Sequence, residues 1–548
     1  MSGQRAQTRS AWIVALVLAL CGLALAAHAY SYSFVSDDAY ISMRYSYNLA
    51  HHGELTFNLG ERVEGYTNFL WTVLLAGAIK VGLNPELASQ LFGWFFGALA
   101  LVFVYRITRL LRDGAPPSGW DYVAVCMLPT WGCFAVWCSG GLETQMFCAL
   151  MLAGLARYLA ETADPGRRPW SGVLFALSAM TRPEGMLIFG LVGLHRLAVN
   201  IVAERRYLPT VRQMIWGLGF LLPFGVFMAW RYSYYGDLLP NTFYVKAGSG
   251  AAMAKKWGLP YLWDFVHFNR IYVLLPLLFL LPWRSKVSAA QEPRRSSHTV
   301  VFSLLLPIVL IYTAYVTWVG GDFMAMSRFF VPVMPLIAIL AQEGLRRLVA
   351  ARDAQGQATT VSARPRLRLA LVVVPLLAGG CLNSYGLHRQ SQKMSYYRWG
   401  LDTVAYLRKF ADDRIIIGRW MREQLPSDTY YSVGGAGASV YASRLRALDA
   451  FGLNDHWIAH NGPRVGDRPG HGKMAPEHYI LKKKPDLLCH MAKHQDTVYF
   501  PPPHEAAYWQ ARGYRWACMN PPGLRPRYYC CLRRVDRDLG TQLVEASP

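Results

Sequence analysis

Acidic residues are scarce in this sequence of 548 residues, where 34 Asp and Glu stand against 56 Lys and Arg. Charged residues of both signs make up only 16% of the chain, whereas 53% of its residues are hydrophobic. This balance excludes a disordered chain. Uncharged runs such as 11–27, 304–319 and 369–382 approach the length that crosses a bilayer. The composition therefore excludes an ordinary cytosolic enzyme and predicts a polytopic α-helical membrane protein.

The formal net charge of +22 would suggest nucleic acid as the partner of a soluble protein. Here, however, many Lys and Arg residues lie in short loops between apolar runs, where positive charge fixes the orientation of a membrane protein. Others lie after residue 385, where they could face anionic lipid or lipid-phosphate headgroups. We therefore expect membrane lipids and no nucleic acid as partners.

Cysteines are few in the polar C-terminal part of the chain, which contains Cys489, Cys518, Cys530 and Cys531. No Cys-x-x-Cys spacing is present, which disfavours the rival interpretation of a zinc site. Four cysteines in an oxidising compartment favour two disulfides, with the adjacent Cys530 and Cys531 each pairing elsewhere. The sequence leaves the pairing open. The other six cysteines fall in or beside apolar runs, where cysteine behaves as a small hydrophobe.

The N-terminal apolar run, residues 11–29, follows Arg5 and Arg9. We favour an uncleaved first helix over a signal peptide, because the run is long for a signal sequence. Either interpretation places residues 30–86 outside the cytoplasm. Within them, the apolar stretch 69–81 has a length that suits a helix along the membrane surface. Arg106, Arg109 and Arg112 then fall on the cytoplasmic side, as the positive-inside rule requires.

Further apolar runs alternate consistently with basic loops inside. After a run at 87–104, they span residues 120–138, 142–160, 170–182, 186–200, 212–230, 269–283, 299–319, 329–345 and 368–384. This predicts about eleven transmembrane helices, a transmembrane domain over 1–384 and a soluble domain over 385–548. With a cytoplasmic N-terminus, the soluble domain lies outside the cytoplasm.

The soluble part is polar and has short alternating runs. Residues 429–433 and 487–489 are typical of strands, and 396–410 of an amphipathic helix, so we expect a mixed α/β domain. The glycine-rich segment 434–437 lacks the full G-x-G-x-x-G spacing of a nucleotide-binding loop. We interpret it as a turn from a strand into a helix.

Asp37 and Asp38 are the sharpest chemical feature, because two adjacent carboxylates near a bilayer are costly unless they are solvated, paired or used. The plain alternative is a helix start, with Ser36 or Asp37 as the cap and the acids at the positive end of the helix. The two interpretations are compatible, since a capping aspartate can still present a free carboxylate.

Polar clusters recur at the external ends of the predicted helices, which suggests a shared cavity. They lie at residues 58–68, 139–144, 181–185, 235–246 and 320–323, the last followed by Arg328. The cluster 181–185 separates two short apolar runs and so lies at a re-entrant depth. There Arg182 and Glu184 could pair with each other or bind a ligand.

Taken in order, these segments carry a resemblance. The segments are DDAYISMRYSYNLAHHGELTFNLGERVEGYTNFLW, SGGLET, TRPEG, YYGDLLPNTFYVKAG, GGDFM…RFFVPVMP and RALDAFGLNDHWIAH. Together they resemble polyprenyl-phosphate-sugar-dependent glycosyltransferases of the GT-C superfamily. Within that group, the sequence is most similar to mycobacterial terminal arabinofuranosyltransferases and pilin arabinosyltransferases. The likeness covers most of residues 1–460, and it implies a bacterial inner-membrane protein whose soluble domain is periplasmic.

The resemblance implies inverting transfer of a sugar, D-arabinofuranose by family likeness, from a polyprenyl-phosphate donor to a periplasmic glycan or protein acceptor. It places the general base in the first external loop, on Asp37 or Asp38, and we expect Asp37. Cations must stabilise the leaving phosphate, and we expect Arg182, Lys246 and Arg328 in that role. The further substrate-binding residues that we expect are Arg44, Arg62, Glu64, Glu143, Glu184, Asn241 and Asp322.

Several alternatives stay open from the sequence. The donor sugar could be of mannose or aminoarabinose type. A glycosidase would also use two carboxylates, but it does not need a multi-helix frame. A lipid-linked sugar flippase would also carry intramembrane charges, often within repeated halves, and no repeat is present. We expect catalysis without a cofactor or metal, although Asp37 and Asp38 could hold a divalent ion. His456 and His460 could bind a metal if helical, but a polar helix face is favoured.

Overall fold

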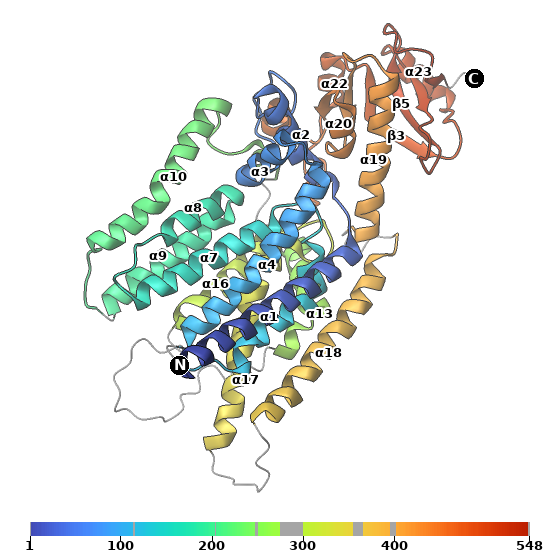
Figure 1. The fold of residues 1–548 in the computed structure, drawn as a ribbon. Coiled ribbons are helices and arrows are strands. Elements are labelled where there is room, and N and C mark those ends of the chain that lie inside the picture. Colours follow the sequence, from blue (N-terminus) through green and yellow to red (C-terminus); the bar gives the residue numbers. More distant parts are fainter. Residues whose placement is uncertain are drawn as a thin grey trace.

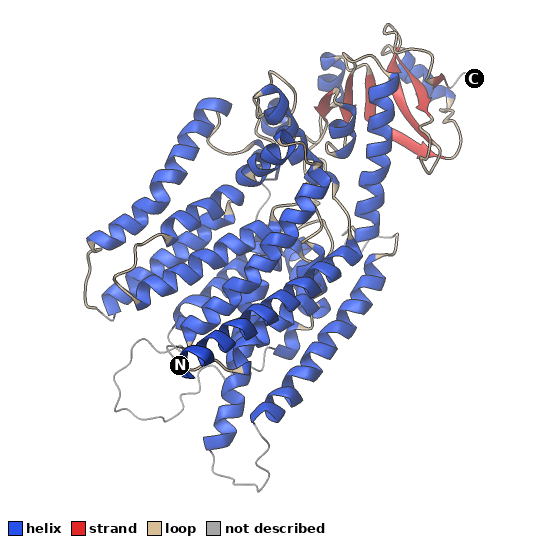
Figure 2. Cartoon of the chain, viewed as in Figure 1, coloured by secondary structure: helices blue, strands red, loops and turns tan. Residues whose placement is uncertain are grey.

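The computed structural model describes residues 2–112, 115–202, 204–246, 250–274, 300–354, 365–394 and 402–545. It is a bundle of long helices with a small mixed sheet domain at one end (Figures 1 and 2). The protein is therefore a multi-pass helical membrane protein with a C-terminal α/β domain, as the sequence predicts.

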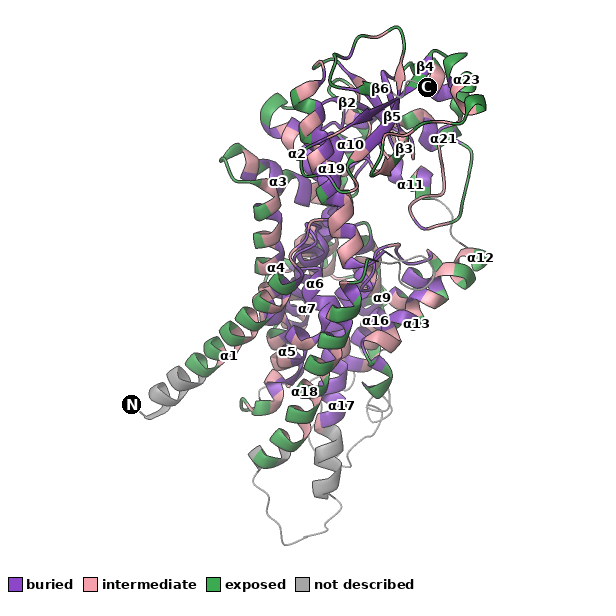
Figure 3. Ribbon diagram, turned by 90° about the vertical axis from the view of Figure 1, so that its right-hand side faces the viewer, coloured by how far each residue is buried: buried purple, intermediate pink, exposed green. Residues whose placement is uncertain are grey.

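Eight helical segments within the described residues are long and apolar enough to cross a membrane. They are Ala11–Tyr32, Pro85–Leu111, Thr144–Ala163, Glu184–Val202, Val211–Tyr235, Val301–Trp318, Arg328–Arg346 and Leu369–Ser391. The predicted span 269–283 lies mostly outside the described residues, and the predicted span 170–182 is a shorter helix. Figure 3 shows that α1 and α18 have many exposed residues while the centre of the bundle is buried. Apolar helices exposed in this way are suited to contact with lipid.

The bundle is built from these helices and from shorter ones between them. The long helices are α1 (Ser2–Tyr32), α4 (Pro85–Leu111), α7 (Thr144–Ala163), α9 (Glu184–Val202), α10 (Val211–Tyr235), α16 (Leu306–Trp318), α17 (Met334–Ala354) and α18 (Pro365–Ser391). The shorter ones are α8 (Ser171–Thr181), α11 (Asn241–Lys246), α12 (Ala251–Met253), η3 (Ala254–Gly258), α13 (Leu259–Phe268), η4 (Val301–Leu305) and η5 (Arg328–Val333).

The predicted helix over 120–138 is wrong as a single helix. The chain there forms four short pieces, η1 (Gly119–Tyr122), α5 (Val123–Met127), η2 (Leu128–Thr130) and α6 (Gly132–Val136). Pro129 cannot donate a backbone hydrogen bond, so it interrupts the helix. The backbone N–H groups of Ala124 and Gly132 donate instead to the side chains of Gln342 and Ser384. Such a broken backbone is tolerated at membrane depth because it is buried in protein.

The predicted external loop 30–86 contains two helices. α2 (Asp37–His52) ends at Gly53, which adopts the left-handed conformation (φ 73°) that glycine accepts without strain. α3 (Phe69–Lys80) matches the apolar stretch expected at 69–81 and packs against α2. Both lie at the end of the bundle that carries the sheet domain (Figure 1).

The sheet of the C-terminal domain has the strand order β2-β1-β3-β5-β4-β6. β1 pairs in parallel with β2 and β3, and the remaining neighbours are antiparallel. The strands are β1 (Tyr430–Val433), β2 (Arg446–Asp449), β3 (Leu487–Gln495), β4 (Tyr514–Met519), β5 (Tyr528–Arg534) and β6 (Val544–Glu545). The strands expected at 429–433 and 487–489 are confirmed as β1 and the start of β3.

Helices of this domain connect the strands and cover the sheet. They are α19 (Val404–Gln424), α20 (Ala438–Ser443), α21 (His456–Asn461), α22 (Glu477–Lys483) and α23 (Pro503–Gln510). The helix expected at 396–410 instead begins at Val404, where the Thr403 hydroxyl accepts from the Tyr406 amide, and it runs on to Gln424. Residues 396–401 of that prediction lie outside the described residues. The glycine-rich segment 434–437 is the turn from β1 into α20, as expected.

Two disulfides join the antiparallel strands, Cys489 to Cys531 and Cys518 to Cys530. The expectation of two bridges with Cys530 and Cys531 pairing elsewhere is confirmed, and the rival zinc site on these cysteines is excluded. Adjacent strand residues point to opposite faces of a sheet. One bridge therefore lies in the hydrophobic cluster on each face of the sheet.

We expect the variant Cys518→Ser/Cys530→Ser to lose about 2–4 kcal/mol of stability, because the open chain regains the entropy of a closed loop. The melting temperature of the purified protein measures this loss. Cys381→Ser, at an exposed free cysteine, should leave the melting temperature unchanged. An unchanged melting temperature of the double variant would contradict a structural role of this bridge.

Candidate active site

Asp37 and Asp38 form the first turn of α2, at the junction between the bundle and the sheet domain. The expected acids at the helix start are confirmed, but the Ser36 hydroxyl does not cap α2. It donates instead to the Gly140 carbonyl. The Asp37 carboxylate accepts from the amides of Gly437 and Ala438, at 3.1 and 2.8 Å, where α20 begins. Asp37 therefore links α2 to the sheet domain and holds its carboxylate in a fixed orientation.

Burial raises the pKa of the Asp37 carboxyl to about 6, because desolvation disfavours the charged form. The Ala438 amide opposes this shift, the neighbouring charge of Asp38 adds to it, and Arg414 and the Gly437 amide also lower the pKa. A carboxyl that titrates near neutral pH is well matched to accept a proton in a reaction. By solvent exposure, Asp37 and the adjacent Asp38 are both half-buried.

Asp38 faces a set of charged groups from three other parts of the chain. It lies close enough to Asp402 and His471 to influence the pKa of both. The Asp402 pKa is raised to about 6, first by burial, against the opposing charge of Arg468. The Arg468 guanidinium donates to the Asp402 carboxylate at 2.7 Å. Lys246, which we expected to bind the donor phosphate, helps to lower the pKa of His471.

Arg328 and Asp322 connect this group of charges to the bundle. The Arg328 Nε lies 2.7 Å from an Asp322 carboxylate oxygen, and both side chains are buried. The charge of Asp322 in turn helps to raise the pKa of Asp402. The backbone amide of Asp402 donates to the Phe323 carbonyl at 2.8 Å, which ties the start of the sheet domain to the loop 320–323.

Arg182 is the centre of a second buried network. Its guanidinium contacts the carboxylates of Glu143 and Glu184 at 2.7 and 2.8 Å, and Asn68 donates to Glu143 at 2.8 Å. The ring of Phe329 lies between Arg182 and Arg328, 4.8 and 5.0 Å from their guanidinium carbons. The pairing of Arg182 with Glu184, one of the two alternatives left open by the sequence, is present.

These contacts and through-space effects link the charges into one continuous set. Arg328 contacts Asp322 and Arg182 contacts Glu143, whereas Asp38 and Asp322 influence Asp402, and Arg328 influences Glu143, through space. The structure thus brings together Asp37, Asp38, Arg182, Arg328, Glu143, Glu184 and Asp322 from the predicted site residues, with Lys246 at its edge.

Other predicted site residues lie outside this set of charges. Glu64 pairs with the buried Arg231, and burial raises the Glu64 pKa to about 7. The Asn241 amide group donates to the carbonyls of Gly452 and Leu453. Arg44 donates to the carbonyls of Phe57 and Leu445. All three side chains are buried in structural contacts, whereas Arg62 is exposed and stacks on Tyr234.

Asp402, Arg468 and His471 are site residues that sequence reasoning missed. Arg468 and His471 lie in the loop 462–475, which is rich in glycine, proline and basic residues. That density of charge beside a predicted external domain is the signal that could have found them. Their partners, however, come from segments distant in sequence.

Comparisons with known proteins identify a matching family and similar curated proteins. A family described as a domain of unknown function, DUF8728, matches residues 403–530. Terminal beta-(1->2)-arabinofuranosyltransferases of Corynebacterium glutamicum and Mycobacterium tuberculosis are 27% and 29% identical over 56% and 45% of this chain. The aligned regions cover 47% and 40% of those proteins, so the chain spans less than half the length of these curated relatives.

Among solved structures, the chain is similar to ArnT from Cupriavidus metallidurans bound to undecaprenyl phosphate. The TM-score is 0.56 at 12% identity, and the match covers 95% of this chain and 98% of ArnT. The chain has a GT-C fold. In this fold, the charges around Asp38 and Arg182 lie where the helical bundle meets the sheet domain.

We expect Glu143→Ala to destabilise the protein by about 3 kcal/mol, because it removes one partner of a buried ion pair and leaves the Asn68 amide group with only its second acceptor, the Ser42 hydroxyl. Thermal unfolding in detergent measures the effect. Asp164→Ala is the matched control, since its pair with Arg167 is exposed and should contribute less than about 1 kcal/mol. Equal melting temperatures for the two variants would show that the Arg182 network does not hold the fold.

Proposed function

We propose that this protein is a membrane glycosyltransferase that moves a sugar from a polyprenyl phosphate to an external acceptor. The observation that carries the proposal is the continuous set of carboxylates and guanidinium groups at the junction of a GT-C bundle with its sheet domain. Named relatives that transfer arabinofuranose support a pentose, D-arabinofuranose, as the sugar. The ArnT complex with undecaprenyl phosphate supports a polyprenyl-phosphate donor.

In this mechanism Asp37 removes the proton of the acceptor hydroxyl as that oxygen attacks the anomeric carbon. The bond from the anomeric carbon to the phosphate oxygen breaks as the new glycosidic bond forms, so a single displacement inverts the centre. Two features support Asp37, its raised pKa and the fixed orientation that the Gly437 and Ala438 amides impose. Each Asp37 carboxylate oxygen accepts one hydrogen bond from a backbone amide and keeps further lone-pair capacity.

Cations stabilise the negative charge that develops on the leaving phosphate. Lys246 is exposed at the end of α11 and is suited to meet an entering phosphate. Arg182 and Arg328 are held by carboxylates, which fixes their orientation and reduces their net positive charge. Glu143, Glu184 and Asp322 thus position these cations in the proposal, and they could also accept from sugar hydroxyls. In this proposal the site operates without a metal. It faces the periplasm at the outer surface of a bacterial inner membrane.

The direct test is transfer from a panel of synthetic polyprenyl-phosphate sugars by purified wild type and by Asp37→Asn. We expect turnover of the arabinofuranosyl donor and a loss of about 10²–10⁴-fold in kcat for Asp37→Asn, as for removal of a general base. Asp38→Asn is the matched comparison and should lose less. Both variants must retain the wild-type melting temperature, because Asp37 also contacts the sheet domain.

The opposite ranking, with Asp38→Asn inactive and Asp37→Asn active, would assign the base to Asp38. Turnover of only a mannosyl or an aminoarabinosyl donor would replace D-arabinofuranose as the proposed sugar. Saturable donor binding that both variants retain, without turnover of any donor, would support a flippase instead.

A pH profile gives an independent prediction. The Asp37 carboxyl must be ionised to accept a proton, so kcat/KM should rise about tenfold per pH unit below pH 6 and level off above it. Asp402 titrates in the same range and is the necessary control. Asp402→Asn should keep the rise near pH 6, whereas a rise that disappears in this variant would assign it to Asp402.

A further inference from the structure

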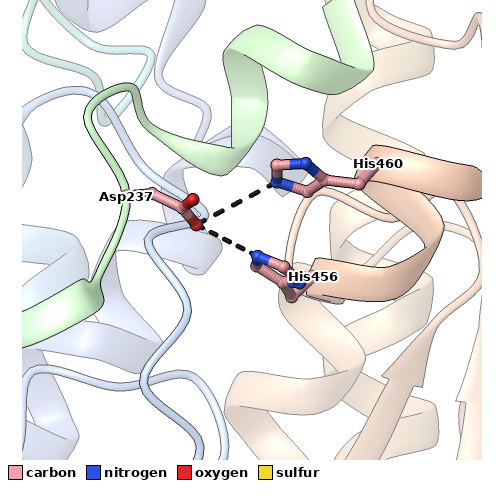
Figure 4. A group of neighbouring side chains, drawn as sticks. All are labelled: Asp237, His456 and His460. Atoms are coloured by element: carbon pink, nitrogen blue, oxygen red, sulfur yellow. Dashed lines mark ion pairs between the residues drawn. The ribbon is translucent and has the colours of Figure 1, made fainter.

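A cluster outside the proposed active site joins the bundle to the sheet domain. Asp237 lies in the loop between α10 and α11, and His456 and His460 lie on α21 (Figure 4). One ligand atom from each side chain lies within 4.8 Å of the others. The His456 Nε2 is 3.2 Å from the Asp237 carboxylate, and the His460 Nε2 is 4.0 Å from it.

This geometry is close to that of a bound metal. Zinc binds imidazole nitrogen and carboxylate oxygen at about 2.0–2.2 Å with tetrahedral angles, which places its ligand atoms about 3.3 Å apart. The contact between His456 and Asp237 already has that separation. His460 lies 4.0 Å from Asp237, and the three ligand atoms lie within 4.8 Å of one another, so the His460 ring, which stacks on His456, must rotate to bring all three to it. The i, i+4 spacing brings both rings to one side of α21, with centroids 4.2 Å apart.

The surroundings keep the histidines available as ligands. The ring of Tyr244 packs 4.0 Å from the His460 ring and limits its orientation. All three side chains retain solvent access, so an ion can enter from outside.

We propose that Asp237, His456 and His460 bind one zinc ion, with a fourth position left for water or an external ligand. The two histidines come from the sheet domain and the aspartate from the bundle, so the ion fastens one to the other. The contact already includes the Asn241 hydrogen bonds to the carbonyls of Gly452 and Leu453. The bound ion therefore also fixes α11, which ends at Lys246.

The competing interpretation is an ordinary ion pair between Asp237 and a protonated histidine. It predicts weak pairing that disappears above the histidine pKa and no preference for zinc. Zinc binding has the opposite pH dependence, because protons compete with the metal for the same nitrogens.

The test uses the full-length protein without a histidine tag, stripped with a chelator and dialysed against zinc at neutral pH. We expect one zinc per chain by elemental analysis. His456→Ala and Asp237→Asn should each weaken zinc binding by at least roughly 10–100-fold. Loss of a residue that only supports a metal ligand already costs that much, and these residues are ligands themselves. His504→Ala, at an exposed histidine of α23, is the matched control and should bind as the wild type does.

Two readouts besides stoichiometry separate a built site from adventitious binding. Cobalt in place of zinc should give the visible absorption of a tetrahedral site, lost in His456→Ala. Zinc should also slow amide exchange in residues 236–246 and 452–461. No stoichiometric zinc, or equal binding by the wild type and the variant His456→Ala/His460→Ala, would overturn the proposal whatever the transfer activity.

Discussion

The contact between α2 and the sheet domain is the constraint on which the site depends. The Asp37 carboxylate accepts from the first amides of α20, and the backbone of Gly437 lies so close that a side chain there would meet the Asp37 carbonyl oxygen at 1.8 Å. Only glycine fits this approach. The same contact that docks the domain therefore also orients the carboxylate that we assign as the base.

Charge burial is the second organising feature. Arg182, Arg328 and Arg231 are all buried, and each has a carboxylate within ion-pair distance. Such pairs are costly to assemble, because desolvation offsets much of their attraction, and they are weak evidence for stability by themselves. Their position at the end of the bundle beside the sheet domain fits the proposed function, in which a charged, lipid-linked substrate is bound in a low dielectric.

The C-terminal domain contributes more than a cover for this site. Arg468 and Asp402 bring charges to the acids of α2 and to the loop 320–323, and the bridges of Cys489 and Cys518 stabilise the sheet behind them. The histidines of α21 face the loop after α10 on the same junction. An acceptor that is selected by this domain would thus be selected beside the donor phosphate.

The sequence by itself determined the membrane helices, the mixed C-terminal domain and the pair Asp37–Asp38, because apolar runs, strand alternation and adjacent acids are local patterns. It could not determine the broken backbone at 119–136. Such a break is tolerated because distant side chains, Gln342 and Ser384, accept hydrogen bonds from its backbone amides. Only the tertiary structure decided the partners of Asp37, the place of Arg468 and the meeting of Asp237 with His456. These contacts join segments far apart in the chain, and no local periodicity encodes which distant segments will meet.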